Sequence, residues 1–195
     1  MGQETDGQRV VSAPNIVEAY RDYVPPQTVL PIIKDLLKTV PPRYLVGLQT
    51  IILTNQAAQP RKRQRQKTWS RNHKIRLVHA RGYYSGATRT SRASITLHID
   101  NILKGTSARD LKLPLLRYFS LGTVLYHEIG HHIHAEHNPS NEGKENVAED
   151  WSDKLLQRFV RAHYWYLWPL MKVGVLIVKL GRLVNPRFMR EIDGG

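Results

Sequence analysis

The sequence predicts a single α+β domain in which a small, mostly antiparallel sheet packs against two long helices. Short segments rich in β-branched or alternating apolar residues occupy its first half, and two long helical patterns follow them. The chain has 195 residues, enough for one domain with a proper core. It contains no cysteine, so a disulfide framework and a thiolate metal site are both excluded.

The N-terminal part begins with an arm and continues into the domain. Residues 1–26 are polar with scattered prolines, so we expect a flexible arm that precedes one domain over residues 27–195. Apolar residues recur on one face from Thr28 to Val40, which predicts a helix. Residues 44–54 are rich in aliphatic and β-branched residues and predict a strand.

Three further short segments predict the rest of the sheet. Residues 74–80 alternate loosely and favour a second strand, and residues 82–86 favour a turn or a short strand. Residues 93–100 show the clearest alternation in the chain. The inward residues of this strand are predicted to be Ile95, Leu97 and Ile99, and the outward ones Ser94, Thr96 and His98.

The segment from Leu113 to His134 is apolar on more than one face, which predicts a central helix. It contains an H-E-x-x-H motif, His127-Glu128-Ile129-Gly130-His131. Residues four apart lie on nearly the same side of a helix, so His127 and His131 can bind one Zn²⁺ while Glu128 acts as general base on its water. Without a metal, Glu128 would be a carboxylate in an apolar segment with no cationic partner, which is rare.

A catalytic zinc usually takes a third protein ligand and one water. A second amphipathic helix, predicted over residues 144–159, places Glu145 at the edge of its apolar stripe. Glu149, one turn further on, is an alternative ligand or a residue that orients a ligand. His137 has the spacing of H-E-x-x-H-x-x-G-x-x-H, but His134 replaces the glycine that lets the chain turn back.

The run from residue 127 to residue 156 resembles the gluzincins, especially compact single-domain members of the minigluzincin and ImmA/IrrE-like type. The run reads H-E-x-x-H followed by Glu145-x-x-Ala148-Glu149-x-Trp151-Ser152-x-x-Leu155-Leu156, where the family has E-x-x-A-[N/D]-x-F-A-x-x-L-L. It departs from the family pattern at Glu149, Trp151 and Ser152. A second register, Glu149-Asp150-Trp151-Ser152-Asp153, resembles the E-x-x-S-D of thermolysin-like enzymes. Both glutamates therefore remain candidates for the third ligand.

The resemblance implies a zinc-dependent metalloendopeptidase that hydrolyses protein or peptide substrates, with Glu128 as general base. It also implies an edge strand, just before the active-site helix, that pairs with extended substrate. We place that strand at residues 94–99.

Charge suggests a different class of function. The formal net charge is +13, and residues 61–74 form a basic loop, which favours contact with nucleic acid or an anionic membrane. Residues 160–195 form an apolar and basic helical segment with the same potential. The alternative to a peptidase is therefore a metal-stabilised binding or regulatory protein with little proteolysis. Without cysteine or a signal peptide pattern, we expect a cytoplasmic location, with peripheral membrane association as an alternative.

Overall fold

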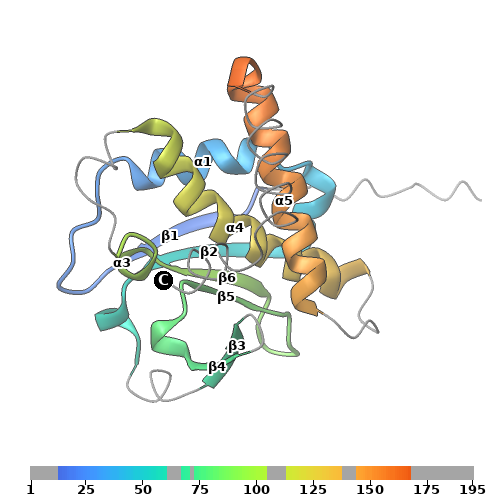
Figure 1. Ribbon diagram of the computed structural model, residues 1–195. Helices are drawn as coiled ribbons and strands as arrows, with labels where there is room; N and C mark the ends of the chain where they lie inside the picture. The colour runs from blue at the N-terminus through green and yellow to red at the C-terminus, as the bar shows by residue number, and fades with distance from the viewer. Residues whose placement is uncertain (1–12, 61–66, 71–72, 105–112, 138–143, 168–195) are drawn as a thin grey trace, which may run out of the picture. The chain divides into compact units, whose positions relative to one another are not determined.

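The computed structural model describes residues 13–60, 67–70, 73–104, 113–137 and 144–167 (Figure 1). These residues form an α+β fold, which confirms the predicted class. The strands are β1 (Asn15–Ala19), β2 (Leu48–Thr54), β3 (Lys67–Ser70), β4 (His73–Arg76), β5 (Gly82–Ser85) and β6 (Ala93–His98). The helices are α1 (Val29–Lys38), α3 (Ile99–Ile102), α4 (Pro114–His137) and α5 (Lys144–His163). Short 3₁₀ segments are η1 (Pro42–Leu45), η2 (Gln56–Ala58), η3 (Leu77–His79) and η5 (Trp165–Leu167).

The main sheet has four strands in the order β1-β2-β6-β5. β1 pairs with β2 and β2 with β6 in parallel, and only β5 pairs antiparallel, with β6. The prediction of a mostly antiparallel sheet is therefore wrong, and the sheet is mixed. The chain leaves β1 and passes through α1 before it enters β2, and such a crossover returns the chain in the same direction.

β1 also corrects the prediction of a flexible arm over residues 1–26. Asn15–Ala19 pairs along its length with residues 50–54 of β2, while residues 1–12 lie outside the described part of the structure. Four of the five β1 residues are exposed. An edge strand of this kind is held by backbone hydrogen bonds and needs no apolar stripe, so periodicity does not reveal it.

Two other strands differ from their predicted bounds. The strand predicted over residues 44–54 starts only at Leu48, because residues 42–45 form η1 and Gly47 has a left-handed backbone with φ of 84°. The strand predicted over residues 74–80 is shorter and belongs to a separate two-stranded sheet, β3-β4. Residues 61–66 and 71–72 of the predicted basic loop lie outside the described residues, so its contacts with nucleic acid or membrane stay predictions.

β6 is an interior strand, which changes the interpretation of its alternating pattern. Ile95, Leu97 and Ile99 are buried as predicted, but the supposedly outward Thr96 and His98 are buried as well. Both faces of this strand are therefore covered, and its alternation does not separate a core face from a solvent face.

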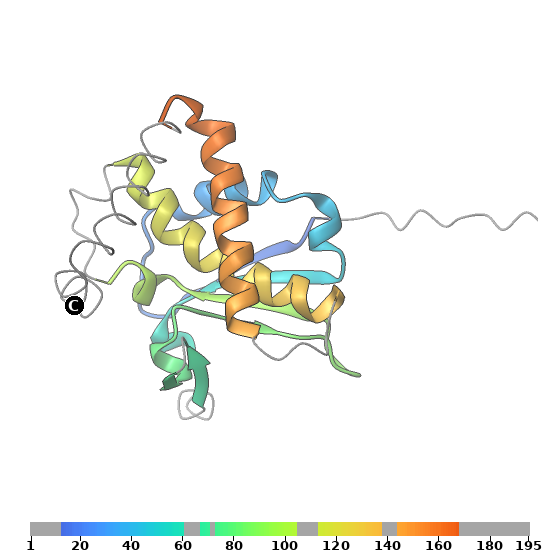
Figure 2. The same ribbon diagram turned by 45° about the vertical axis from the view of Figure 1, so that its right-hand side comes forward.

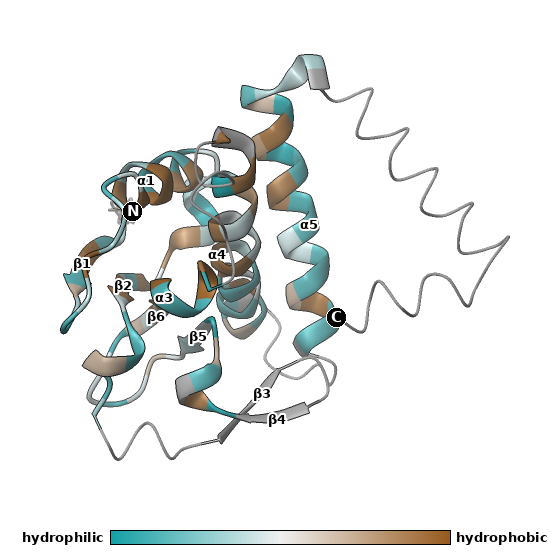
Figure 3. Ribbon diagram, turned by 60° about the vertical axis from the view of Figure 1, so that its left-hand side comes forward, coloured by the Kyte–Doolittle hydropathy of each residue, from teal (hydrophilic) through white to brown (hydrophobic). Residues whose placement is uncertain are grey.

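Helices α1 and α4 cover the same face of the sheet in both views (Figures 1 and 2). Hydrophobic residues are prominent on both helices, whereas α5 is mainly hydrophilic with hydrophobic positions interspersed (Figure 3). The Tyr126 hydroxyl of α4 is buried and donates a hydrogen bond to the Leu36 carbonyl of α1 at 3.0 Å. The buried apolar residues of the two helices are Val29, Ile32, Ile33, Leu36, Leu121, Leu125, Tyr126, Ile129 and Ile133. This core holds α4 in place against the sheet.

The chain divides into two compact units, Met1–Leu156 and Gln157–Gly195. In the second unit the described residues run from Gln157 to Leu167, and the Phe159 and His163 rings stack with centroids 4.4 Å apart. Most of the predicted C-terminal segment, from residue 168 onwards, lies outside the described residues. Among the helices that are described, none combines the length and apolar character needed to cross a membrane.

Candidate metal centre

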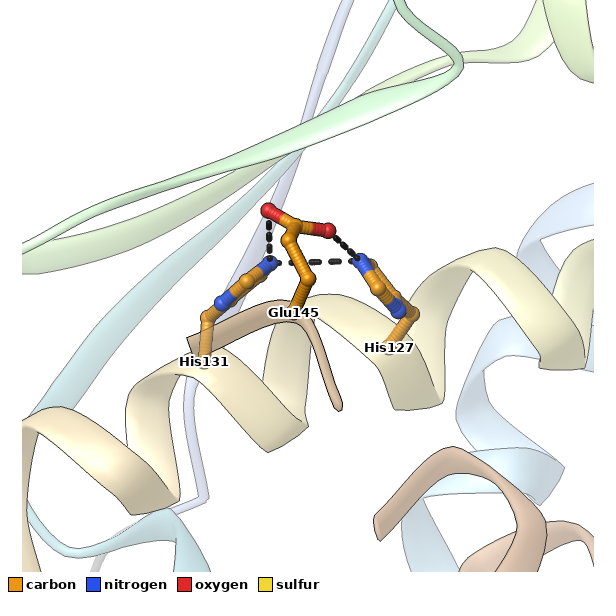
Figure 4. Close-up of side chains that lie close together, drawn as sticks. All are labelled: His127, His131 and Glu145. Carbon is orange, nitrogen blue, oxygen red and sulfur yellow. Dashed lines mark hydrogen bonds and ion pairs between the residues drawn. The ribbon is translucent and has the colours of Figure 1, made fainter. Parts of the chain in front are cut away.

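Three side chains predicted as metal ligands converge at one point (Figure 4). The Nε2 atoms of His127 and His131 are 3.2 Å apart. Glu145 Oε2 lies 3.4 Å from His127 Nε2, and Glu145 Oε1 lies 3.6 Å from His131 Nε2. Each side chain keeps about a fifth to a quarter of its surface exposed (23%, 18% and 27%), so the centre is accessible from solvent.

The two histidines meet because α4 is continuous through the motif. One helical turn separates them, and their rings lie edge to face with centroids 4.7 Å apart. Two imidazole nitrogens on one side of a helix, with their lone pairs directed to the same point, form half of a tetrahedral ligand set.

Glu145 reaches this point because α5 approaches α4 very closely. A Cβ atom on Gly130 would lie 2.7 Å from the Ala148 carbonyl oxygen and 2.8 Å from its Cα. The Ser152 hydroxyl donates to the Thr123 carbonyl of α4 at 3.2 Å, and the Trp151 ring contacts that of Tyr44 at 4.8 Å between centroids. The small residues of the motif therefore fix where α5 crosses α4, and this crossing places the first turn of α5 over the histidines.

Glu128 follows His127 on α4, but its side chain packs against β5 and not against α5. A Cβ atom on Gly82 would lie 3.1 Å from Glu128 Oε1 and 2.9 Å from Val124 Cγ1. Glu128 is 6% exposed, and its pKa is raised to about 8. Burial is the main cause, the charge of Glu145 adds to it, and a hydrogen bond from the Tyr84 backbone N–H partly opposes the shift.

The other predicted ligands do not join this cluster within the described part of the chain. Glu149 is exposed and is not one of the three converging residues, so the geometry favours Glu145 between the two glutamates. The side chain of His137, at the end of α4, lies outside the described residues.

The edge strand beside Glu128 is β5, and residues 94–99 do not form an edge of the described sheet. The predicted strand corresponds to β6, which lies between β2 and β5, so the prediction that it forms the edge is wrong. Strand order depends on the path of the chain, and alternation within one segment does not report it. The available signal was the run Gly82-Tyr83-Tyr84-Ser85, which combines a glycine with β-prone aromatic residues before the clear strand.

The backbone of β5 presents two residues to its open edge. The His98 N–H donates to the Arg81 carbonyl at 2.8 Å, so Arg81 faces β6. The backbone N–H and C=O groups of successive residues point alternately towards and away from the paired strand. Those of Gly82 and Tyr84 therefore point away from β6. The hydrogen bond from the Tyr84 N–H to Glu128 agrees with this direction.

Comparison with known proteins gives no family for this chain: no family model, no curated protein and no solved structure matches it. The structure itself shows a cluster of two histidines and one glutamate, with H-E-x-x-H spacing, that can hold a metal ion.

Proposed function

We propose that this chain is a gluzincin-like, zinc-dependent metalloendopeptidase, with His127, His131 and Glu145 as zinc ligands and Glu128 as general base. The proposal rests on one observation. The ligand atoms of His127, His131 and Glu145 converge, and the buried Glu128 lies on the same helix as the two histidines. The buried Glu128 is the more telling feature, because a buried carboxylate is unfavourable without a compensating charge.

The distances between the ligand atoms suit zinc. At zinc–ligand distances of about 2.1 Å, tetrahedral geometry separates neighbouring ligand atoms by about 3.4 Å. The observed separations of 3.2, 3.4 and 3.6 Å lie around this value. Two imidazoles and one carboxylate are also the ligand types of catalytic zinc sites, which leave a fourth position for water.

The chemistry divides between the ion and the chain. Bound Zn²⁺ supplies a Lewis acid that lowers the pKa of water and polarises a carbonyl. Glu128 accepts the proton of the attacking water and later delivers it to the leaving amine. Glu128 would act as a base in its ionised form, which a divalent cation held by His127, His131 and Glu145 would favour against the effect of burial on its pKa.

The substrate class follows from the edge of the sheet. β5 lies next to Glu128, and the backbone groups of Gly82 and the Tyr84 carbonyl face its open edge, while the Tyr84 N–H donates to Glu128. An extended peptide recognises such an edge through main-chain hydrogen bonds, which require no particular side chain. We therefore propose an unfolded or extended peptide as substrate, bound along β5.

The decisive experiment compares wild type with Glu128→Gln after zinc loading, using unfolded casein. We expect cleavage by wild type and a loss of about 100-fold or more in Glu128→Gln, because general bases contribute about 10²–10⁴ in rate. Zinc content should be equal in both proteins. Glu136→Gln is the matched control, because Glu136 is an exposed carboxylate two turns further along α4, and it should cleave like wild type.

Equal cleavage by Glu128→Gln and wild type, or no chelator-sensitive cleavage in either, would contradict peptidase action. If zinc binding were retained in that case, the result would support the metal-stabilised binding protein instead.

A further inference from the structure

Tyr84 of β5 makes two hydrogen bonds to α4, one through its backbone and one through its side chain. Its backbone N–H donates to the Glu128 carboxylate, and its phenol oxygen lies 3.3 Å from His132 Nδ1. The Tyr84 and His132 rings are 5.5 Å apart between centroids. Glu128 and His132 are four residues apart, so they occupy the same side of α4 on successive turns. One strand residue therefore bridges a full turn of the central helix.

The hydrogen bonds of His132 define the direction of the contact with Tyr84. His132 Nε2 lies 2.9 Å from the Val46 carbonyl oxygen, which can only accept, so Nε2 carries the hydrogen and donates. The remaining ring nitrogen, Nδ1, accepts from the Tyr84 hydroxyl. His132 is only 1% exposed, and both of its nitrogens are engaged. This histidine therefore connects α4, the segment before β2 and the edge strand.

We propose that His132 is a positioning residue for Glu128 and for the peptide-binding edge, an inference that rests on the proposed peptidase function. β5 has four residues, and among the described strands it pairs with β6 alone, so its distance from α4 depends on side-chain contacts. The bond from His132 to the Tyr84 hydroxyl fixes this distance at one end of the strand, and the packing of Gly82 on Val124 and Glu128 fixes it at the other. The Tyr84 N–H then holds the Glu128 carboxylate, and Gly82 faces the open edge beside it.

This role is distinct from holding the metal. Glu145 of α5 lies next to His127 and His131 because α5 crosses α4 at Gly130. His132 contacts Tyr84 and Val46, neither of which belongs to α5. Loss of the His132 contact should therefore reduce turnover and leave zinc affinity unchanged.

The test uses His132→Phe, Tyr84→Phe and the double variant, all loaded with zinc. We expect each single variant to lose about tenfold in kcat/KM, the effect typical of outer-shell partners, and mainly through kcat. Zinc affinity should stay within about twofold, which separates positioning from ligand support. The double variant should lose no more than His132→Phe alone, because both changes break the same connection.

The matched control is Tyr83→Phe. Tyr83 is the neighbouring residue of β5, its side chain lies on the other side of the strand, and its ring is 5.8 Å from that of His98. This variant loses a phenol hydroxyl from the same strand, and its kcat/KM should stay within about twofold of wild type.

Hydrogen exchange gives a measurement that does not depend on cleavage. In His132→Phe the Tyr84 amide should exchange about tenfold faster, while the interior amides of β6 keep their wild-type rates. Unchanged exchange at Tyr84, unchanged kcat/KM, strictly additive losses or a tenfold loss of zinc affinity would each overturn the proposal. If wild type cleaves nothing, the exchange result still decides the positioning role, so the two failures are distinguishable. If His132→Phe does not fold, Tyr84→Phe carries the same test, because it removes only one hydroxyl.

Discussion

Helix α4 meets α5 on one side and β5 on another, and both contacts depend on a glycine. On the α5 side the glycine is Gly130 of α4 itself, and the atoms that approach it are backbone atoms of Ala148. On the β5 side the glycine is Gly82 of the strand, and the approaching atoms are side-chain atoms of Val124 and Glu128. The first contact brings Glu145 to the histidines, and the second places the edge strand on the proposed base.

This difference leads us to expect that the proposed ligand set and the proposed base are held by separate contacts. Changes at the α5 contact should alter metal binding, and changes at the β5 contact should alter turnover with the metal in place. The contacts also differ in tolerance, because a backbone neighbour moves less readily than a side chain. Four variants test this comparison.

Glu145→Gln should have the largest effect, because it removes the charge that α5 contributes to the cluster. Loss of a partner that only supports a ligand already costs about 10–100-fold in metal affinity, so we expect at least about 100-fold weaker zinc binding here. Competition with a chelating dye measures the affinity. Wild-type affinity in this variant would exclude Glu145 as a ligand and return attention to Glu149 and His137.

Gly130→Ala should have the next largest effect. The added Cβ would lie 2.7 Å from the Ala148 carbonyl oxygen, so α5 must shift away from α4. We expect about tenfold weaker zinc binding and a free energy of unfolding lowered by about 1–3 kcal/mol, the usual cost of overpacking. Chelator competition and denaturant titration of the metal-free protein measure the two effects. An unchanged zinc affinity would show that this helix crossing does not place Glu145.

Gly82→Ala tests the other contact. The added Cβ would lie 2.9 Å from Val124 Cγ1 and 3.1 Å from Glu128 Oε1, so the strand and the carboxylate must separate. We expect kcat/KM to fall about tenfold while zinc affinity stays within about twofold. Steady-state kinetics on a peptide and chelator competition give both values. A loss of zinc in parallel with activity would show that the two contacts are coupled.

Glu149→Gln should have the smallest effect. Glu149 is exposed and lies outside the converging set, so its charge is not required at the centre. Zinc affinity and kcat/KM should both stay within about twofold of wild type, as for most surface substitutions. This variant is also the matched control for Glu145→Gln, since the two glutamates lie one turn apart on α5. A tenfold loss of zinc affinity would favour the register that makes Glu149 the ligand.

Local spacing was enough to predict the parts of the site that lie on one helix. His127, Glu128 and His131 are separated by one turn or less, so the helical repeat alone brings them together. The apolar stripe over residues 144–159 also predicted the second helix and made Glu145 a candidate for the third metal ligand. The choice between Glu145 and Glu149 did not, because it depends on where α5 crosses α4, which the contact between Gly130 and Ala148 sets.

The sheet was predicted less well, for a related physical reason. Alternation in residues 93–98 correctly indicated a strand, but it carries no information about neighbours, and β6 proved to be interior. β1 is short, mostly exposed and without alternation, so it was assigned to an arm, and its parallel pairing with β2 was missed.

The sequence alone thus established the α+β class, the helix that carries the H-E-x-x-H motif and a second helix with a nearby carboxylate, because helical periodicity is a local property. The three-dimensional fold was needed to choose Glu145, to identify β5 as the edge and to join Tyr84 to Glu128 and His132. These contacts arise between segments far apart in the chain, and the close packing of those segments determines them.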